Sequence, residues 1–580
     1  MSIFRSKDIE VLDDHIENIV TKADHERHAK VKPTIDEMWD IIFTVRDFVI
    51  EKKRKIYGGF ALHKLIESVA PEDGVYDNDD IESWDIDFYS PDPLEDAREI
   101  ADRLYKKNYR FVFATEAQHE ETYKVYAETL DCADISYVPR YIYNRIPFKE
   151  VNGLHLTGPH FMMIDYFRMI TDPLTSYFRI EKSLTRLHLM EKHFPLPRNT
   201  SAIDIVPAED NLDIAFRTVH DFFTDRETTI VLGTYAYNHY VLESGIANRK
   251  QSGGRRSGSG SGSGSGNRNT SHQAEMKLIP INYYEAISTS YKRDARDLIR
   301  KLREKFIDNG SLIVHQESYP FFQYLGYSVT IKFEEDVICK LYHYNHRCTP
   351  YRTVSAHYFG DREYDTPKKD GKIQIGSFPM IILYNLITIM KARTDQDNHT
   401  KNTYYTLNSH LLEMCNWYLD QNDKTIYDDT PFKYFILQCL GEMLTPKMEK
   451  AIRIQRKIDS GKRFTWRYTP ENDKHKGVGT WRFKNTSGNP IRYDKNLQID
   501  LDAPESDIND DIESQLDSQE EVDEQAESEV EKNANKTETE KGDDGRLGRE
   551  TTNPAKTTNP ADTSDNDPPD TTDMTDTDSD

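Results

Sequence analysis

The chain contains two sets of similar segments in the same order, and this internal repetition limits the folds that it can adopt. The stretch YGGFALHKLI near the N-terminus is similar to VLGTYAYNHYV at 231–241, and DPLEDAREIADRLYKK is similar to SYKRDARDLIRKLREK at 290–305. Later runs also match, including GPHFMMIDYFRMITDP and GSFPMIILYNLITIMKARTD. Repeats that keep their order and rough spacing predict a duplicated structural unit.

Hydrophobic spacing within the first set predicts both helices and strands. Thr34 lies three residues before Glu37 at the start of an apolar run with helical spacing, a capping box that is typical of a helix start. A second helix is expected over 61–69, and the run WDIDFYS at 84–90 predicts a buried strand. The predicted fold class is therefore mixed α/β (α+β), a duplicated unit with additional helical elements.

Composition divides the 580 residues further. A Gly/Ser-rich run is typical of flexible coil, and we interpret it as a surface loop inside the second unit. The predicted segments are an N-terminal helical segment at 1–50, a first domain at 51–200, a second domain at 201–445 with the Gly/Ser-rich loop at 251–273, a basic aromatic segment at 446–498 and an acidic tail at 499–580.

The acidic tail carries most of the net charge of -25. Residues 500–580 contain 28 Asp and Glu against 6 Lys and Arg, a net of -22 (28 minus 6), which leaves about -3 for the rest of the chain. A tail with so few large apolar residues cannot offset its ordering entropy, so we expect it to be disordered. The nearly neutral remainder does not exclude nucleic-acid binding, as the total charge alone would suggest.

Cysteine usage and hydropathy restrict the type of protein. The five cysteines lack the C-x-x-C spacing of a zinc site, and their odd number does not suit a disulfide framework, so a reducing compartment is expected. The chain shows neither an apolar signal sequence nor a run of about 18 uncharged apolar residues. We therefore predict no membrane association.

Two carboxylates lie together in the predicted strand at 84–90. Side chains at i and i+2 of a strand share a face, so Asp85 and Asp87 are expected to project together. Neighbouring carboxylates repel each other unless they bind divalent cations, and a pair of metal ions is common in phosphoryl transfer. Asp134, in the predicted strand CADISYVP, is the best candidate for a third ligand, and Asp131 is the alternative.

A glycine pair precedes the predicted helix at 61–69. Gly58 and Gly59 allow a close approach of the backbone to a triphosphate, and the helix after them offers free N–H groups and the positive end of its dipole. The G-x-x-x-x-G-K-[ST] pattern of a P-loop does not occur here, and Lys64 lies too far along the helix to replace its lysine.

In this order, GGF, WDIDFY and ADIS resemble the Gly-Gly, Asp-x-Asp and Asp signature of polymerase-β-type nucleotidyltransferases. The run MIDYFRMITDPLTSYFRIEKSLTRLHLMEKHFP at 163–195 is similar to the catalytic subunits of poxvirus poly(A) polymerases, and the duplicated layout resembles the poly(A) polymerases of mimivirus-like giant viruses. The resemblance covers about residues 30–500. Phe60 follows the glycines where this family often has serine.

The resemblance implies that the first unit is catalytic and the second is degenerate. Setting INYYEA against DIDFYS places Pro280 and Asn282 opposite the Asp-x-Asp pair, with Glu285 as the only nearby acid. Lys340 or Leu341 then corresponds to the third carboxylate. We expect the second unit to shape an RNA channel.

The resemblance also implies cofactors, substrates and partners. Two Mg²⁺ or Mn²⁺ ions would be held by Asp85, Asp87 and Asp134, with ATP as the AMP donor and the 3′ end of single-stranded RNA as the acceptor. Tyr177 and Lys182 are the expected contacts to the triphosphate, and the basic run at 52–55 offers further candidates; a solvent-exposed basic surface explains these side chains equally well. A homodimer or a partner subunit is expected, as is a virus-encoded protein of the host cytoplasm, with the virion as a second location.

The segment 447–496 predicts an RNA contact. It contains 14 Lys and Arg against 5 Asp and Glu, with aromatic residues between the basic ones. Base stacking on aromatic rings combined with backbone neutralisation holds single strands without sequence readout. Strands that pack on the protein body are the alternative explanation. The predicted RNA-binding residues are Arg463, Trp466, Arg467, Tyr468, Trp481 and Arg482.

Two other functions fit the same residues. A terminal uridylyltransferase or an oligoadenylate synthetase would share the carboxylates and differ in base choice. A non-catalytic RNA-binding or processivity subunit could retain the scaffold, but such a chain would be expected to lose its carboxylates.

Overall fold

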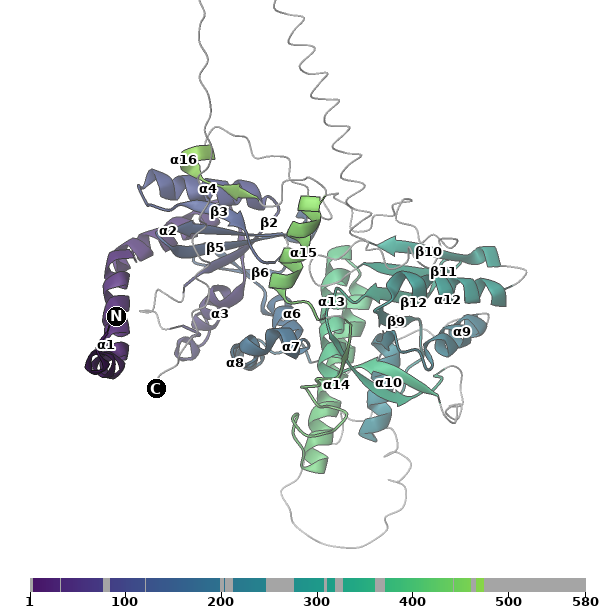
Figure 1. Ribbon diagram of the computed structural model, residues 1–580. Coiled ribbons are helices and arrows are strands. Elements are labelled where there is room, and N and C mark those ends of the chain that lie inside the picture. The colour runs from purple at the N-terminus through teal and green to yellow at the C-terminus, as the bar shows by residue number, and fades with distance from the viewer. Residues whose placement is uncertain are drawn as a thin grey trace, which may run out of the picture. The chain divides into compact units, whose positions relative to one another are not determined.

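The structure is a computed structural model of the chain. Two sheets organise the part that it describes (Figure 1). The described residues are 4–31, 33–76, 84–119, 121–198, 203, 212–246, 276–306, 310–318, 327–359, 371–441, 443–459 and 466–473.

The first half of the chain forms a sheet with helices on both faces. A capping box at Thr34 begins α2, as the sequence predicts. Helices α2 and α4 contact each other over one face of the sheet, and α3, α6 and α8 pack together elsewhere on it. The elements are α1 (Ser6–Val31), α2 (Ile35–Glu51), β1 (Lys55–Ile56), α3 (Gly58–Glu67), β2 (Ile86–Ser90), α4 (Pro93–Lys106), β3 (Phe113–Glu116), β4 (Thr122–Ala127), β5 (Leu130–Tyr137), α5 (Arg140–Tyr143), β6 (Phe148–Val151), β7 (Leu154–Thr157), α6 (Pro159–Ile170), α7 (Pro173–Ser176), the 3₁₀ turn η3 (Tyr177–Arg179) and α8 (Ile180–His193).

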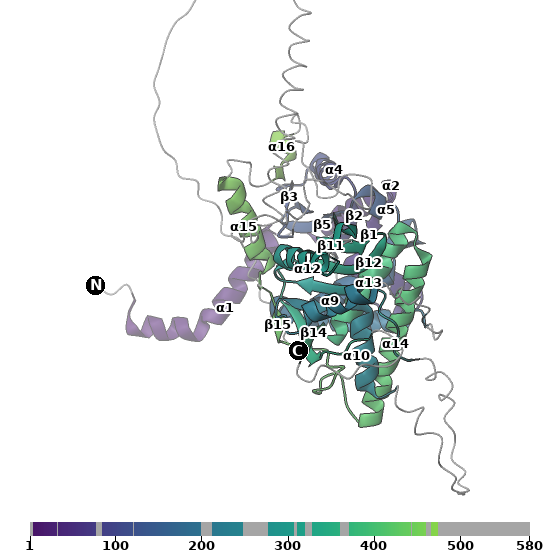
Figure 2. The same ribbon diagram turned by 90° about the vertical axis from the view of Figure 1, so that its right-hand side faces the viewer.

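The second half repeats this arrangement. Helices α9 and α12 pack together and both contact the sheet (Figure 2), while α10, α13 and α14 form a second group. The elements are α9 (Asp213–Phe223), β8 (Thr229–Val231), α10 (Gly233–Ser244), β9 (Tyr284–Ser288), α12 (Tyr291–Lys305), β10 (Ile313–Ser318), β11 (Ser328–Phe333), β12 (Asp336–His343), β13 (Thr349–Ser355), β14 (Lys372–Gly376), α13 (Phe378–Asp395) and α14 (Asn398–Asn422).

The strand orders of the two sheets show the duplication directly. In the described part of the chain the first sheet runs β16-β3-β4-β5-β2-β1-β7-β6 and the second runs β10-β11-β12-β9-β8-β14-β13-β15. Apart from the added end strands β16 and β15, each strand of one sheet has a counterpart at the same place in the other. The register of β4 on β5 shifts at Val125/Tyr126, and that of β11 on β12 shifts at Ile331/Lys332, the same place in each repeat. The mixed α/β class and the duplicated unit are therefore confirmed.

A buried ion pair is also repeated between the halves. Arg54 donates two hydrogen bonds of 2.7 Å to Asp96, which also accepts one from Ser90 at the end of β2. In the second half Arg226 donates to Asp294, which accepts a hydrogen bond of 2.7 Å from Ser288. Burial of a charge is tolerated when it is paired and hydrogen-bonded, and here the pair fixes the strand to the helix that follows it.

The C-terminal segment returns to both sheets. Strand β15 (Cys439–Leu440) pairs with β13, and β16 (Arg467–Tyr468) pairs with β3 at the edge of the first sheet. Between them α15 (Pro446–Asp459) contacts the turn after β3, where Arg453 donates a 3.0 Å hydrogen bond to the carbonyl of Gln118. A short helix, α16 (Pro470–Asp473), contacts α4. A chain segment from beyond the second half therefore completes the first sheet.

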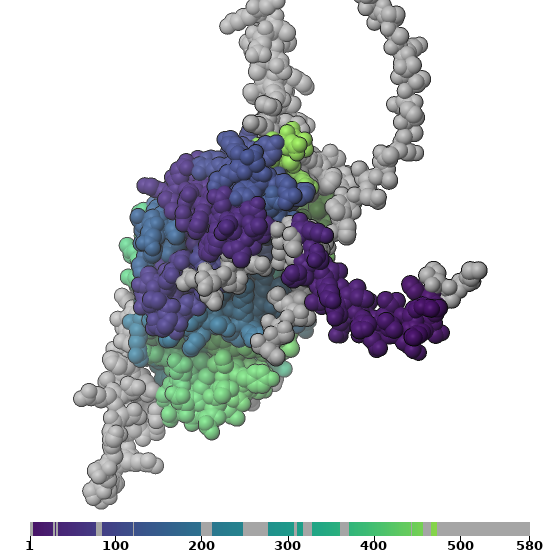
Figure 3. All heavy atoms as spheres, turned by 90° about the vertical axis from the view of Figure 1, so that its left-hand side faces the viewer, coloured from purple at the N-terminus to yellow at the C-terminus, as the bar shows by residue number. Residues whose placement is uncertain are grey.

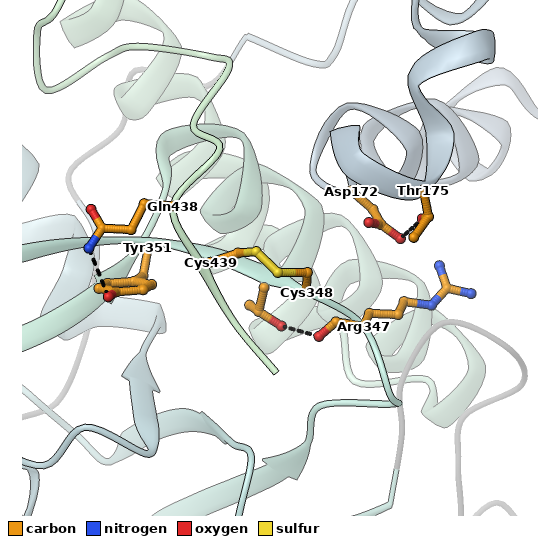
Figure 4. Close-up of a disulfide and its surroundings, with 8 residues drawn as sticks. Asp172, Thr175, Arg347, Cys348, Tyr351, Gln438 and Cys439 are labelled. Atoms are coloured by element: carbon orange, nitrogen blue, oxygen red, sulfur yellow. Dashed lines mark hydrogen bonds between the residues drawn. A yellow bond between two sulfur atoms is a disulfide. The ribbon is translucent and has the colours of Figure 1, made fainter. Parts of the chain in front are cut away.

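A disulfide joins Cys348, before β13, to Cys439 on β15 (Figure 4). The odd number and scattered spacing of the cysteines predict no disulfide framework, and this prediction is wrong for this pair. Residues 91 apart in sequence become neighbours because β15 pairs with β13, with Pro350 opposite Cys439, which local spacing cannot reveal. Cys132, Cys339 and Cys415 are buried free thiols, in the core rather than at a reactive surface.

Other predictions concern membrane association, the Gly/Ser-rich loop and the acidic tail. Among the described residues, none of the helices is both long and apolar enough to span a bilayer. The Gly/Ser-rich loop at 251–273 and the acidic tail at 499–580 lie outside the described residues. The segment boundaries inferred from composition stay a prediction.

Candidate active site

Strands β2 and β5 bring two predicted carboxylates side by side. The strands are parallel neighbours, and Asp87 lies opposite Asp134 in the register. Strand β4 flanks β5 on its other side and places Lys124 opposite Asp134, with the lysine Nζ 3.0 Å from Asp134 Oδ1. The same Nζ contacts Asp131. Lys124 is a site residue that the sequence analysis missed, although its outward place in the alternating strand TYKVYA would have suggested it.

Asp85 lies at the entrance of this group. It precedes β2, two residues before Asp87, and its side chain is exposed whereas Asp87 is partly buried. The structure thus places the Asp-x-Asp pair at the start of the strand. Asp131 lies beyond the register shift between β4 and β5, opposite Tyr126, so it does not share the direct pairing with Asp87.

The carboxylates raise one another's pKa. Desolvation, followed by the charges of Asp85 and Asp134, holds the pKa of Asp87 well above its usual value. Desolvation and the charge of Asp134 raise the pKa of Asp131 to about 7. Desolvation also raises the pKa of Asp134, a rise that Lys124 opposes. This is a surplus of negative charge that one lysine does not neutralise.

The donor set fits hard divalent cations. Carboxylate oxygens are the ligands that Mg²⁺ and Mn²⁺ prefer, and Asp131 Oδ1 is buried without a hydrogen-bond partner among the described residues. Within the same part of the chain no group of three or more His, Cys, Asp or Glu side chains is already arranged around a metal position. The Lys124 ammonium contacts both Asp131 and Asp134. A metal ion at Asp134 would compete with that lysine.

The glycine turn lies directly against Asp87. Gly58 has φ +73°, and a Cβ built on it would overlap the Asp87 carboxylate. The Tyr57 N–H donates a 2.8 Å hydrogen bond to the Asp87 carbonyl, and the Tyr57 hydroxyl lies 2.8 Å from Ser136 Oγ on β5. Only glycine fits this close approach of the turn to the carboxylate.

Helix α3 begins at Gly58, three residues earlier than predicted, so the glycine pair forms its first turn. Tyr57 at the N-cap makes no side-chain capping hydrogen bond, which leaves the first N–H groups of α3 available to an anion. A Cβ on Gly59 would meet the Tyr76 hydroxyl and an Arg186 nitrogen, which form a 2.9 Å hydrogen bond with each other. Arg186 was missed, although it lies one helical turn after Lys182 in the same segment.

The predicted triphosphate contacts occupy an exposed segment. Tyr177 is 73% exposed in η3, and Lys182 is exposed on α8. Arg179, between them, acts electrostatically on Asp134. This segment therefore lies within electrostatic reach of the carboxylates, and contact with a triphosphate stays a prediction.

The predicted RNA-binding segment is only partly described. Arg463, Trp481 and Arg482 lie outside the described residues. Trp466 and Tyr468 are buried at the edge of the first sheet, where Trp466 meets Tyr123 edge-on and the Tyr468 hydroxyl donates to Asp102.

Their burial is a correction to the expected base stacking, because in this conformation neither ring offers a face to a base. Packing on the protein body, the alternative explanation, accounts for both rings. Arg467 remains exposed, with its guanidinium 4.5 Å from the Phe113 ring centroid.

The second half keeps an acid at one of the three carboxylate positions and replaces the other two. Glu285 on β9 corresponds to Asp87, because a Cβ on Gly233 (φ +60°) would overlap it and its carbonyl accepts from the N–H of Leu232, as in the first half. Lys340 lies opposite Glu285 and corresponds to Asp134. The alignment that placed Pro280 and Asn282 against the Asp pair is thus wrong, and Tyr283 corresponds to Asp85.

Tyrosines close the second site. Glu285 is buried and accepts hydrogen bonds of 2.7 Å from Tyr342 and 2.8 Å from Tyr404. The Lys340 Nζ lies 4.2 Å from the Tyr283 ring centroid. The lone carboxylate is satisfied by protein groups, which agrees with the prediction that this half is catalytically inactive.

The chain contains two copies of one mixed sheet, and the first copy places paired carboxylates against a glycine turn. This arrangement is that of a duplicated nucleotidyltransferase. Known proteins agree. Residues 43–176 match the poly(A) polymerase catalytic subunit family, and residues 264–501 match the C-terminal region of a mimivirus poly(A) polymerase catalytic subunit.

Individual relatives give the same result. A protein of Acanthamoeba polyphaga mimivirus, described as a poly(A) polymerase catalytic subunit, is 30% identical over 524 residues, covering 88% of this chain and 87% of its own. An African swine fever virus protein with the same description is 34% identical over 163 residues, covering 26% and 33%. The crystal structure of the Megavirus polyadenylate synthase matches with a TM-score of 0.69 and 29% identity, covering 86% of this chain and 94% of that one. The chain belongs to the family of viral poly(A) polymerase catalytic subunits, which are nucleotidyltransferases, and the resemblance inferred from the sequence is confirmed.

Proposed function

We propose that the protein adds AMP from ATP to the 3′-hydroxyl of RNA without a template, using the carboxylates of the first half. The observation that carries this proposal is the pairing of Asp87 with Asp134 against the turn at Gly58. Family membership supports polyadenylation over uridylylation or oligoadenylate synthesis. A purely non-catalytic subunit is disfavoured, because all three carboxylates are present in this half and only one of the three positions keeps an acid in the other.

Asp85, Asp87 and Asp134 would hold two Mg²⁺ or Mn²⁺ ions. When bound, such ions lower the pKa of the attacking hydroxyl and neutralise the triphosphate and the departing pyrophosphate. Support comes from desolvation and the neighbouring Asp85 and Asp134, which together keep the pKa of Asp87 well above its usual value. Asp134 would exchange its ion pair with Lys124 for a metal contact, and Lys124 would remain paired with Asp131.

The remaining groups would orient the substrates. The backbone N–H groups in the first turn of α3, including those of Gly58 and Gly59, would bind the triphosphate. No capping side chain competes for them, because Tyr57 makes no side-chain capping hydrogen bond. Arg186, held by Tyr76 beside Gly59, adds a fixed positive charge at this turn. Lys182 lies one helical turn before Arg186 on α8, so we assign ATP contacts to Lys182, Arg186 and the N–H groups of the turn.

We propose that the protein forms a homodimer, as a chain that must stay on a growing tail requires a means of retention. Helix α1, the dark purple segment of Figure 3, carries exposed apolar side chains at coiled-coil spacing. They are Ile9 (48% exposed), Leu12 (37%), Ile16 (51%) and Ile19 (47%). Light scattering should show a dimer for the full chain and a monomer for Ile16→Lys.

The viral relatives support a virus-encoded enzyme that acts in the host cytoplasm or the virion.

Extension of a labelled RNA primer with each NTP separately tests the reaction. We expect extension with ATP and Mg²⁺ or Mn²⁺, and its loss in the Asp85→Ala/Asp87→Ala double variant. The matched control is Asp92→Ala, which removes a carboxylate just after β2 that pairs with Arg140 at the surface. Equal extension with UTP would indicate a uridylyltransferase instead, and extension by the double variant would place the chemistry elsewhere.

A further inference from the structure

An exposed aromatic pair immediately precedes Arg179, which acts electrostatically on Asp134. Tyr177 and Phe178 in η3 are 73% and 67% exposed, and their ring centroids are 5.5 Å apart. The next residue, Arg179, lies over the Phe178 ring at 5.5 Å and also acts electrostatically on Asp134. Neighbouring large aromatic side chains that remain exposed are typical of a binding surface rather than of packing.

Arginines from three parts of the chain gather next to this pair. Arg453 on α15 is fixed to the turn after β3 by its hydrogen bond to Gln118. Arg168, on α6, and Arg347, from the second half, join Arg179 there. All four arginines act on His119, which follows Gln118 in the turn after β3 and is partly open to solvent. Desolvation and then the positive charges of Arg168, Arg347, Arg179 and Arg453 lower the pKa of His119.

Arg347 reaches this place from the turn before the Cys348–Cys439 disulfide. Figure 4 shows its guanidinium extending toward Asp172 and Thr175 at α7, immediately before the aromatic pair. Desolvation and repulsion from Arg168 lower the pKa of Arg347 to about 10. Three acids moderate the positive charge, since Asp165 lies 3.3 Å from Arg168, and Asp172 and Glu449 act on Arg347.

We infer that this surface, formed by Tyr177, Phe178, Arg179, Arg347 and Arg453, binds the last nucleotides of the single-stranded RNA primer before they reach Asp134. Exposed rings can stack on bases whatever their identity, and arginines can neutralise successive phosphates. Both features occur together here, and Arg179 among them acts electrostatically on Asp134, as a primer whose end reaches that carboxylate requires. The inference rests on the proposed function and assigns its RNA contact to η3 and α15 instead of the buried rings at 466 and 468.

The phosphates could instead belong to a nucleoside triphosphate, so the experiment measures both. Fluorescence anisotropy of a labelled oligoadenylate about 15 nucleotides long, without ATP or metal, reports RNA binding separately from catalysis. The KM for ATP at saturating RNA reports nucleotide binding. The test variants are Tyr177→Ala/Phe178→Ala and Arg347→Gln/Arg453→Gln. The matched control is Tyr427→Ala, which removes an 80% exposed tyrosine from the loop after α14.

We expect the aromatic variant to bind the oligonucleotide about tenfold more weakly. The arginine variant should reduce the steepness of log Kd against log salt by about 1.4, because each phosphate contact to a single strand contributes about 0.7. The KM for ATP and the control variant should stay unchanged. A raised KM for ATP with unchanged RNA binding would overturn the inference in favour of a triphosphate site, and so would unchanged values of both.

Failure of this inference is distinguishable from failure of the proposed function. Wild-type extension with ATP that depends on Asp85 and Asp87 can succeed while the oligonucleotide binds elsewhere. The aromatic rings are exposed, so their removal leaves the core intact, and an unchanged thermal transition verifies this.

Discussion

The two halves of this chain share a sheet and differ in the charges at one place on it. In the first half, Asp87 faces Asp134 across β2 and β5, while in the second Glu285 faces Lys340 across β9 and β12. One pair repels and the other attracts. The difference shows that the scaffold does not require the paired carboxylates, since the same strands of the second half fold around Glu285 and Lys340.

The features that the halves share are those that build the backbone. Both halves have a positive-φ glycine against the acidic side chain of the strand, Asp87 or Glu285, and a register shift at the same place. Both also have a buried Arg–Asp pair at the helix that follows this strand, α4 or α12. The features that differ are those available to a ligand. The second half fills its site with Tyr342 and Tyr404, whereas the first leaves Asp85 exposed.

The largest effect is expected from giving the first half the residue that the second half uses. Asp134→Lys should reduce primer extension by about 10³-fold or more, because it removes a proposed metal ligand and adds a cation beside Lys124. Primer extension under single-turnover conditions measures it. Lys340→Met, the change at the corresponding position of the second half, should leave extension within about twofold, and an equal loss there would contradict the division of roles.

The ion pairs that the two halves share should both stabilise the fold, with the larger contribution in the first half. Asp96→Ala removes the carboxylate that pairs with Arg54 and should reduce the free energy of unfolding by about 3–5 kcal/mol. Asp294→Ala should cost less, about 1–3 kcal/mol, because Arg226 keeps Asp297 as a second partner at 3.2 Å. Arg54 is 13% exposed and Arg226 is 22% exposed, which adds to this difference. Urea denaturation followed by circular dichroism checks this. A loss under about 1 kcal/mol at either position would contradict this stabilising role.

The two glycines separate stability from chemistry. Gly58→Ala and Gly233→Ala both introduce a Cβ at positive φ against a carboxylate, so each should reduce stability by about 1–3 kcal/mol. Only Gly58→Ala should also displace Asp87 and reduce extension, by about 100-fold. Thermal unfolding and primer extension on the same preparations distinguish the two effects. Normal extension by Gly58→Ala would show that the turn does not position the carboxylate.

The smallest effect concerns pH. Asp131 has a pKa of about 7 in the folded protein and about 3.9 when unfolded. The folded state therefore binds more protons between these values, and stability should fall as pH rises from about 4 to 7. Thermal unfolding without divalent ions should show this decline, which should be weaker in Asp131→Asn. Mg²⁺ or Mn²⁺ should raise the transition temperature more at pH 7 than at pH 5, and a larger effect at pH 5 would contradict carboxylate binding.

Local patterns in the sequence were enough to predict several elements. The capping box at Thr34, the strand around Asp87 and the repeated segments all depend on residues close in sequence, and the structure contains them. Asp134, the candidate third ligand, lies directly opposite Asp87 in the register of β2 and β5.

Other features depended on contacts that spacing does not encode. The Gly/Ser-rich insertion lies between Gly233 and β9, so the distance in sequence from the glycine does not reveal which residue of β9 corresponds to Asp87. The close approach of Gly233 to Glu285 in the structure identifies it. The sequence pattern of aromatic residues between arginines is the same for rings that stack on bases and for rings that pack on an edge strand. For this reason the pattern does not reveal that Trp466 and Tyr468 are buried against β3.

The central claim is that the first half alone carries the chemistry, and one matched pair of isosteric changes tests it most directly. Asp87→Asn and Glu285→Gln remove the charge of corresponding carboxylates, and single-turnover incorporation of AMP into an RNA primer measures the result. We predict a loss of about 10³-fold or more for Asp87→Asn and less than twofold for Glu285→Gln. Comparable losses in two variants that are both folded would contradict the claim, and so would normal incorporation by Asp87→Asn.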